Sequence, residues 1–598
     1  MAHLSRRTFL ATTSALAAAC ALPTELLGKA LAAPLAPSGA PTTLQQTILQ
    51  SATANRGYRT LVSAPGEAYI VRHDILRKTP SPARVANRRS LLYIGHLSDI
   101  HIIDAQGPAR IEPAQEVAPD LLTDATRPQE TLCVNVLAAM VGAVKAAEYS
   151  PLTGAPMAAA VNTGDTSDSL SSQELKWAIE ALDGVPITPN SGKVGEYEGV
   201  QKWSEATYAY HPDDPSNDVW GLHGFPQIPG MLTAAVSQTI KPAGCPAPWY
   251  SVFGNHDVVF VGFLPVDAAI RAYSVGDKKA VGASGLITTL TDGWASNPSL
   301  YQRMANQIKT GFGFVPGIKS VTSDSGRSLF SPKAFMQMHL DSPALPGPVG
   351  HGFTQANIDS GQTWWMADLS PHVVAFGLDT CNQTSGADGA VPQPQFDWLE
   401  EQLGILQKQN KMAIILSHHN SFTLENPAQP TVGKAVPLIH ADEFIAMLHK
   451  YPNMVAWLNG HTHVNTITAH AKDGGGGFWE ITTASCIDFP QQQQMVELVD
   501  NKDGTMSIFT TVLDSEAPPQ WTVGDFSQVG LASLSRELAS NSFLSQPLMR
   551  RGSPLDRNCE LLMQSPFDLN IITDAQLEKD QMIAKARLTA HTAKAVTQ

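Results

Sequence analysis

The stretch SLLYIGHLSDIH, residues 90–101, is an apolar run that ends in an acid and an imidazole, Asp99 and His101. Non-alternating apolar runs of about four to eight residues are typical of strands covered on both faces. Five more runs end in polar residues in the same way: MAAAVNTGD (157–165), PWYSVFGNHD (248–257), VVAFGLDT (373–380), MAIILSHHN (412–420) and MVAWLNGHTH (454–463). The pattern predicts buried strands with ligand-binding side chains at their carboxyl ends.

Segments with helical character alternate with these runs, at 130–149, 171–184, 393–408 and 441–450. This alternation indicates an α/β domain, in which ligands bind outside the carboxyl ends of the strands. Two later runs, GFWEITTAS (477–485) and QMVELVDNKDGTMSIFTTVLD (494–514), carry β-type residues, and the second contains a Asn-Lys-Asp-Gly turn typical of a hairpin. A second sheet is therefore expected, whereas QQQQ (491–494) is interpreted as a polar loop.

The chain divides into four parts by composition. We expect an N-terminal signal at 1–33, an N-terminal extension at 34–88, one large domain at 89–516 and a partly helical C-terminal extension at 517–598. Two stretches inside the domain, at about 185–247 and 258–370, are too long for ordinary connections and are interpreted as loop insertions. Long insertions at the ligand-binding ends of strands commonly determine specificity.

The first 33 residues predict export. Arg6 and Arg7 precede a weakly apolar, Ala-rich stretch and an A-x-A cleavage site at residues 30–32, the pattern of a twin-arginine signal. The export machinery is then a partner, and the mature protein is periplasmic or extracellular. Lipid attachment at Cys20 is the alternative, disfavoured because Ala17 stands where a Leu is usual. No run is long enough for a stable membrane span.

Composition excludes some classes of function. With 40 Lys and Arg against 54 Asp and Glu, the formal charge of -14 argues against nucleic acid as a partner. Five cysteines remain after the signal, without a C-x-x-C pair, so neither a disulfide framework nor a zinc ribbon is predicted.

The polar groups at the strand ends share one chemistry. In order they are D-x-H (99–101), G-D-x-x-D (164–168), G-N-H-D (254–257), H-H-N (418–420) and G-H-x-H (460–463). A parallel sheet would bring them to one edge. Carboxylate, imidazole and amide groups without thiolates are the ligands that borderline divalent ions accept.

These five blocks, in this order, resemble the calcineurin-like metallophosphoesterase superfamily. The resemblance spans about residues 89–515 apart from the insertions, and it implies a four-layer αββα sandwich with two mixed sheets. It also implies two transition-metal ions, divalent or trivalent (Mn, Fe or Zn), held by Asp99, His101, Asp165 and His463 on one side and by Asp165, Asn255, His418 and His461 on the other. His419 stays an alternative to His418, because Asn420 replaces the Pro of the usual H-x-P block.

The resemblance also assigns catalytic roles. His256 would contact a phosphate oxygen or protonate the leaving group, with Asp257 on its other ring nitrogen. Asn255, His256 and His351, the last within an insertion, are candidate substrate contacts. Asp168 is expected to support a ligand rather than to bind metal. GDTSDSL (164–170) lacks the Arg-Gly of protein phosphatases, and GNHDVV (254–259) lacks the extension of secreted 5′-nucleotidases.

The predicted function is therefore that of an exported metal-dependent phosphoric ester hydrolase acting on a small phosphate ester. Two ions about 3.5–4 Å apart stabilise both the attacking and the leaving oxygen of an in-line displacement, and a hydroxide shared by the ions is the nucleophile. A phosphodiester is slightly favoured, with phosphomonoesterase or nucleotidase activity as the alternative. A catalytically inactive binding protein on the same fold is the alternative from another class.

Overall fold

The computed structural model describes residues 42–76, 79–117, 123–282, 317–343, 345–429 and 435–597, with side chains up to 590. The predicted signal at 1–33, including Cys20, lies outside the described residues, as does part of the second insertion. None of the helices within the described ranges is long and apolar enough to cross a membrane.

The first of two large sheets has seven strands in the order β3–β19–β18–β17–β4–β5–β6. The neighbours β4, β5 and β6 are parallel, whereas β17 is antiparallel to both β4 and β18. The bounds are β3 (Ile70–Arg72), β4 (Arg89–Leu97), β5 (Ala159–Asn162), β6 (Trp249–Ser251), β17 (Gln492–Asp500), β18 (Thr505–Asp514) and β19 (Cys559–Gln564).

The second sheet has six strands in the order β15–β16–β14–β12–β10–β9. Its four inner strands run parallel, and β9 and β15 are antiparallel at the two edges. The bounds are β9 (Trp365–Ser370), β10 (Val373–Gly377), β12 (Met412–Leu416), β14 (Met454–Asn459), β15 (Thr466–Ala471) and β16 (Gly477–Thr482). Three two-stranded pairs join β1 (Gln46–Gln50) to β2 (Leu61–Pro65), β7 (Lys278–Ala280) to β8 (Ile318–Ser320) and β11 (Val391–Pro392) to β13 (Leu438–Ile439).

Six helices lie in the predicted helical segments or in the C-terminal extension. They are α4 (Cys133–Ala146), α5 (Ser172–Asp183), α12 (Gln393–Lys408), α13 (Ala441–Leu448), α14 (Gln528–Ser540) and α15 (Asp574–Thr597). The other described α-helices are α2 (Arg84–Asn87), α3 (Ala114–Val117), α6 (Val219–Leu222), α7 (Met231–Ser237), α8 (Ala268–Ser274), α10 (Pro332–Asp341) and α11 (Gln355–Ser360). Helix α5 shows why its segment is helical: the Ser171 hydroxyl accepts the N–H of Gln173 at its start, and Gly184 ends it in the left-handed conformation.

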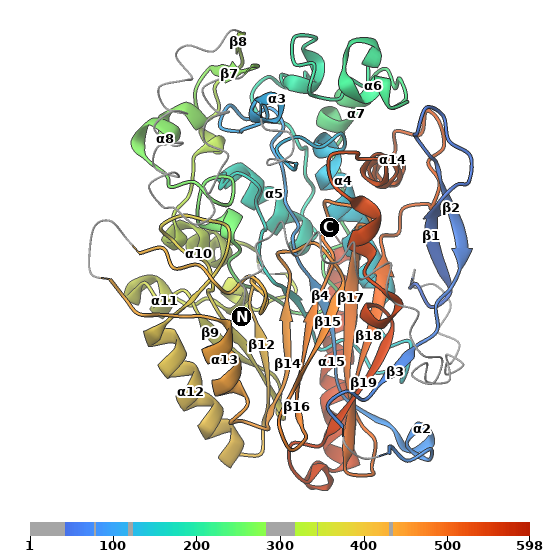
Figure 1. Cartoon of the computed structure of the whole chain (residues 1–598), viewed down its shortest axis with the longest axis vertical. Coiled ribbons are helices and arrows are strands. Elements are labelled where there is room, and N and C mark those ends of the chain that lie inside the picture. The colour runs from blue at the N-terminus through green and yellow to red at the C-terminus, as the bar shows by residue number, and fades with distance from the viewer. Residues whose placement is uncertain are drawn as a thin grey trace.

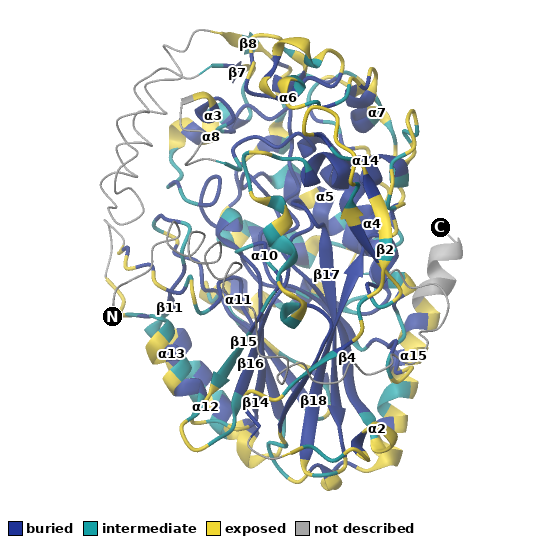
Figure 2. Cartoon of the chain, turned by 45° about the vertical axis from the view of Figure 1, so that its right-hand side comes forward, coloured by how far each residue is buried: buried dark blue, intermediate teal, exposed yellow. Residues whose placement is uncertain are grey.

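Packing explains why the inner strands are largely apolar. One continuous core contains residues of both sheets, such as Ile94 of β4 and Leu458 of β14, together with much of α4. A second core lies between the other face of the six-stranded sheet and helices α12 and α13. Figure 1 shows these two helices beside β12 and β14, and Figure 2 shows the strands buried while the outer turns of α12 and α13 are exposed.

The mixed α/β architecture with two mixed sheets is confirmed, and the four-layer arrangement stays a prediction. The hairpin of β17 and β18 is also confirmed. The interpretation of QQQQ as a polar loop was wrong, because Gln492, Gln493 and Gln494 belong to β17 and are buried. Their amides bond to other buried groups: Gln493 Oε1, for example, accepts the N–H of Ser98 at 2.9 Å. The five described cysteines are buried and free.

Candidate metal centre

The predicted ligands follow strand ends, as the sequence indicated. Asp99 and His101 follow β4, Asp165 follows β5 and Asn255 follows β6 of the seven-stranded sheet. From the six-stranded sheet, His418 follows β12, and His461 and His463 follow β14. All seven side chains are buried. The two sheets therefore bring seven ligand candidates together from more than 360 residues of sequence (463 − 99 = 364).

The first group comprises Asp99, His101, Asp165 and His463, whose ligand atoms lie within 4.8 Å of one another. Nε2 of His463 is 3.2 Å from Oδ1 of Asp99 and 3.2 Å from Nε2 of His101. Two imidazole nitrogens and two carboxylates thus face one point, an arrangement that suits a cation.

The second group comprises Asn255, His418 and His461 with Asp165. Oδ1 of Asn255 is 2.8 Å from Nε2 of His418 and 3.1 Å from Nδ1 of His461, and these two nitrogens are 3.1 Å apart. The amide of Asn255 is oriented because its Nδ2 donates to the carbonyl oxygen of Gly262 (2.8 Å), which turns Oδ1 toward the histidines.

Asp165 belongs to both groups. Its Oδ2 lies 3.3 Å from Nε2 of His101 and 3.2 Å from Nε2 of His418. Its Oδ1 accepts the backbone N–H of His256 at 2.8 Å, which restrains the carboxylate. This is the position that a carboxylate shared by two ions requires.

Three of the histidines have their far nitrogen next to an acceptor. Nδ1 of His101 is 3.0 Å from Oδ1 of Asp168, and Nδ1 of His463 is 2.7 Å from Oδ2 of Asp488. Nδ1 of His418 donates to the carbonyl oxygen of Thr163 (2.9 Å). A proton on each Nδ1 places the lone pair of Nε2 toward the cluster, which is the usual support for a metal-binding histidine.

The backbone at the ligands is unusual. Five of them, Asp99, His101, Asp165, His461 and His463, have positive φ between 46° and 69°. Non-glycine residues in this region cost about 1–3 kcal/mol each and gather at functional sites.

Glycines next to the ligands permit close approach. A Cβ on Gly460 would lie 2.2 Å from Oδ2 of Asp99, and a Cβ on Gly254 would lie 2.2 Å from Oδ1 of Asp165. Any side chain at these two positions would displace a ligand carboxylate, which explains the glycine in each block.

The electrostatics of the cluster favour bound positive charge. Burial lowers the pKa of His101, but hydrogen bonds and charge from Asp165 and Asp168 outweigh it and raise the pKa to about 10. Burial likewise lowers the pKa of His418, and Asp165 outweighs it and raises the pKa to about 9. The carboxylates therefore attract protons onto neighbouring histidines, and a metal cation can take the place of those protons. The nitrogen and oxygen donor set fits Mn, Fe or Zn ions.

The choice between His418 and His419 can be examined in the geometry. His419 directs Nδ1 to the Thr380 hydroxyl (2.9 Å) and Nε2 to the carbonyl oxygen of Ala387 (2.8 Å). Both of its nitrogens thus have partners outside the ligand set, whereas Nε2 of His418 faces Asp165 and Asn255. His419 nevertheless forms a group with His418 and His461 whose ligand atoms lie within 4.8 Å of one another, so the choice of His418 stays a prediction.

His256 lies beside the cluster, with its ring 4.6 Å from that of His101 between centroids. Its Nδ1 is 2.6 Å from the carbonyl oxygen of Asp168, so the expected contact with Asp257 was wrong. Asp257 instead accepts the backbone N–H groups of Thr166, Ser167 and Gly254. These hydrogen bonds stabilise the turn after β5.

His351 is also placed differently from the prediction. It is fully buried, its ring stacks on Trp249 at 3.5 Å, and its Nδ1 contacts Nδ1 of His339 at 2.9 Å. In this position it cannot contact a substrate, because packing between an insertion and β6 encloses it.

Sequence reasoning missed three residues around the cluster. Asp488 holds His463, and Arg127 and Arg550 both pair with Asp488. None lies in a recognisable block, so only the folded chain reveals them.

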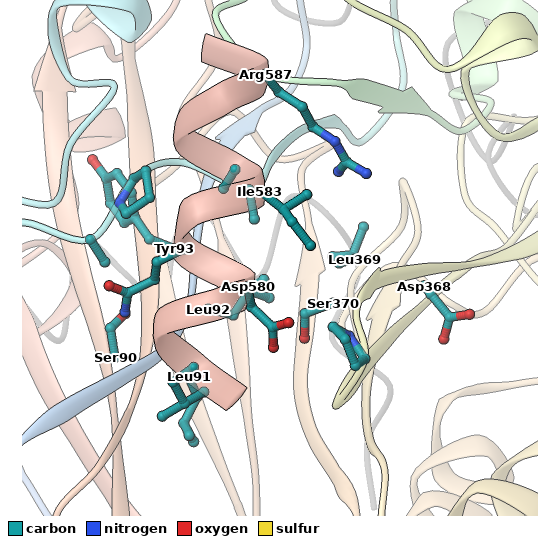
Figure 3. Close-up of a pocket in the computed structure, with 17 residues that line it drawn as sticks. Ser90, Leu91, Leu92, Tyr93, Asp368, Leu369, Ser370, Asp580, Ile583 and Arg587 are labelled. Carbon is teal, nitrogen blue, oxygen red and sulfur yellow. The ribbon is translucent and has the colours of Figure 1, made fainter. Parts of the chain in front are cut away.

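A separate cavity of about 320 Å³ lies at the other end of β4. Ser90, Leu91 and Tyr93 line it with Leu369 of β9 and Ile583 of α15, as Figure 3 shows. Asp99 follows the opposite end of β4, roughly 20–30 Å away at about 3.3 Å per residue. The cavity is therefore distinct from the metal centre.

Comparison with protein families and with curated proteins gives no match for this sequence. Among solved structures, a dimetal phosphatase from Danio rerio is similar with a TM-score of 0.32 and 10% identity, covering 71% of this chain and 100% of its own. A likeness of this degree carries no weight for fold or activity. The basis for a function is the geometry of the cluster itself.

Proposed function

We propose that this chain is a dinuclear-metal phosphoesterase that hydrolyses a small phosphate ester. The observation that carries the proposal is the position of Asp165, whose Oδ2 lies 3.3 Å from a nitrogen of one ligand group and 3.2 Å from a nitrogen of the other. Two ions held by one shared carboxylate would stabilise both the attacking and the leaving oxygen of an in-line displacement at phosphorus. The five sequence blocks support the same assignment.

The bound ions and the protein side chains would have different roles. Bound ions would neutralise phosphate charge and lower the pKa of water, so that a nucleophile forms near neutral pH. The residues that would hold them are the seven buried side chains predicted from the sequence: Asp99, His101, Asp165, Asn255, His418, His461 and His463. Asp168, Asp488 and the Thr163 carbonyl keep three of the imidazole rings in the orientation for binding.

His256 is the proposed proton-transfer residue. With Nδ1 against the Asp168 carbonyl, Nε2 is the ring atom available to a substrate. Burial lowers the pKa of His256, so the ring is neutral at neutral pH before substrate binds. The negative charge of a bound phosphate would favour protonation, after which Nε2–H can donate to a phosphate oxygen or to the leaving oxygen.

A phosphodiester is the favoured substrate class. Three arginines lie next to the cluster, and each forms an ion pair with a carboxylate of the chain. Arg110 pairs with Asp168, and Arg127 and Arg550 both pair with Asp488. A monoester carries a second negative charge at neutral pH that such arginines would otherwise neutralise. The singly charged diester fits the described surroundings better.

We further propose that the protein is exported by the twin-arginine route and acts in the periplasm or outside the cell. The support is the sequence of residues 1–33 alone. Export of a folded chain suits a protein that takes up its ions before it leaves the cytoplasm.

The test is hydrolysis of bis-p-nitrophenyl phosphate beside p-nitrophenyl phosphate by Mn²⁺-loaded protein, with Asp165→Asn as the control. We expect diester hydrolysis in the wild type and its loss in Asp165→Asn. A preference for the monoester would contradict the substrate class. Inactivity on both, in a protein that binds two ions, would support the inactive binding protein instead.

A further inference from the structure

Arg127 contacts both carboxylates that orient the histidines of the first ligand group. Its Nε is 2.9 Å from Oδ1 of Asp488, and its Nη1 is 3.6 Å from Oδ1 of Asp168. Asp488 holds His463, and Asp168 holds His101. The two histidine–carboxylate pairs are thus joined through one guanidinium group.

A second arginine, Arg550, pairs with the same carboxylate of Asp488, although it lies far along the chain. Arg550 lies in the short helix η9 (Pro547–Arg551), within the predicted C-terminal extension. Its Nη1 pairs with Oδ2 of Asp488 and lies 2.9 Å from Nδ1 of His463, and its Nη2 is 3.3 Å from Oδ1 of Asp124. Asp488 is therefore held between two guanidinium groups.

The burial of the ion pairs around Asp488 indicates what they are for. The side chains of Arg127 and Asp488 are each only 7% exposed. Buried ion pairs contribute little net stability, because desolvation offsets their attraction, so their geometry is better explained by what they position. The pair of Arg84 with Glu560 offers a comparison: it is buried and bidentate, at 3.0 and 3.2 Å. Its other hydrogen-bond partners, Ser81, Arg88 and Ser507, are not ligands of the cluster.

We propose that Arg127 is a positioning residue that holds His101 and His463 as one unit for the ion of the first ligand group, with Arg550 fixing Asp488. The inference rests on the proposed metal centre and deepens it. The two Nε2 atoms are only 3.2 Å apart, so a small rotation of either ring would misdirect its lone pair. In the second ligand group, His418 is held by a backbone carbonyl, which does not depend on Arg127.

The experiment is titration of metal-free protein with Mn²⁺, with free Mn²⁺ followed by electron paramagnetic resonance. The variants are Arg127→Gln and Arg550→Gln, with Arg84→Gln as the matched control that also loses a buried ion pair. Loss of support around a ligand weakens metal binding by about 10–100-fold. We expect that loss for one of the two ions in Arg127→Gln, a smaller loss of the same ion in Arg550→Gln, and two unchanged ions in Arg84→Gln.

A double variant tests whether Arg127 acts through Asp488. Because both residues belong to one contact, Arg127→Gln combined with Asp488→Asn should weaken the ion less than the sum of the two single effects. If Arg127→Gln does not fold, Arg127→Lys takes its place: one ammonium group cannot reach both carboxylates as a planar fork does, so the same ion should still be weakened.

Two results would overturn the proposal while leaving the proposed function standing: both ions bound by Arg127→Gln as tightly as by the control, or both weakened equally. A wild type that does not bind two ions would instead remove the proposed function itself.

Discussion

Replacing His418 and His419 one at a time separates a metal ligand from its neighbour in sequence. A four-ligand structural zinc site contributes about 10–16 kcal/mol at neutral pH, so one ligand of four accounts for about 2.5–4 kcal/mol if they share it equally. His418→Ala should therefore weaken the ion of the second ligand group by about 10²–10³-fold in Kd. His419→Ala removes the hydrogen bonds to Thr380 and Ala387 instead. Its cost, about 1–3 kcal/mol for each buried group left without a partner, falls on the free energy of unfolding.

The assay is the metal content of each variant after dialysis against a buffered free Mn²⁺ concentration that just saturates the wild type, together with thermal unfolding. We expect one ion per chain in His418→Ala, and two ions with a lower Tm in His419→Ala. Two ions in His418→Ala with one in His419→Ala would refute the assignment of His418 and reverse the choice.

Two further predictions concern packing and pH. Gly460→Ala should reduce binding of the ion of the first ligand group, because its Cβ would meet Oδ2 of Asp99 at 2.2 Å; metal titration measures this, and full binding would contradict the close approach. The pKa values of His339 and His351 are lowered, chiefly by burial, so these rings are neutral when folded and take up protons only on unfolding. The free energy of unfolding should therefore fall as pH drops below about 6.5, by up to about 1.4 kcal/mol per pH unit for each ring, until that ring becomes protonated in the folded state. Urea unfolding across pH should show a smaller acid slope in His339→Phe, and an unchanged slope would show that His339 is not responsible.

Much of the candidate site could be predicted because its signal is local. Each ligand stands directly after an apolar run, as Asp99 follows β4 and His461 follows β14, and parallel strands end at a common edge. The ligands can thus be predicted from residue type and position at a strand end, even though the distances between their side chains are not known from the sequence.

The remaining features depend on contacts between distant segments. Asp488 and Arg550 have no local pattern, and they act only because folding brings them to His463. The glutamines that begin β17 are polar, so their sequence indicates a loop, but hydrogen bonds to other buried groups compensate their burial. His351 sits in an insertion whose sequence does not reveal that Trp249 covers it.

The most direct test of the dinuclear centre is electron paramagnetic resonance of the protein loaded with Mn²⁺, together with its metal content. A carboxylate shared between two ligand groups, as Asp165 is placed, predicts two ions per chain at about 3.5–4 Å and hence a spin-coupled spectrum. Asp165→Asn should weaken or abolish the coupling. A single ion per chain, or two ions with uncoupled spectra, would contradict the shared site.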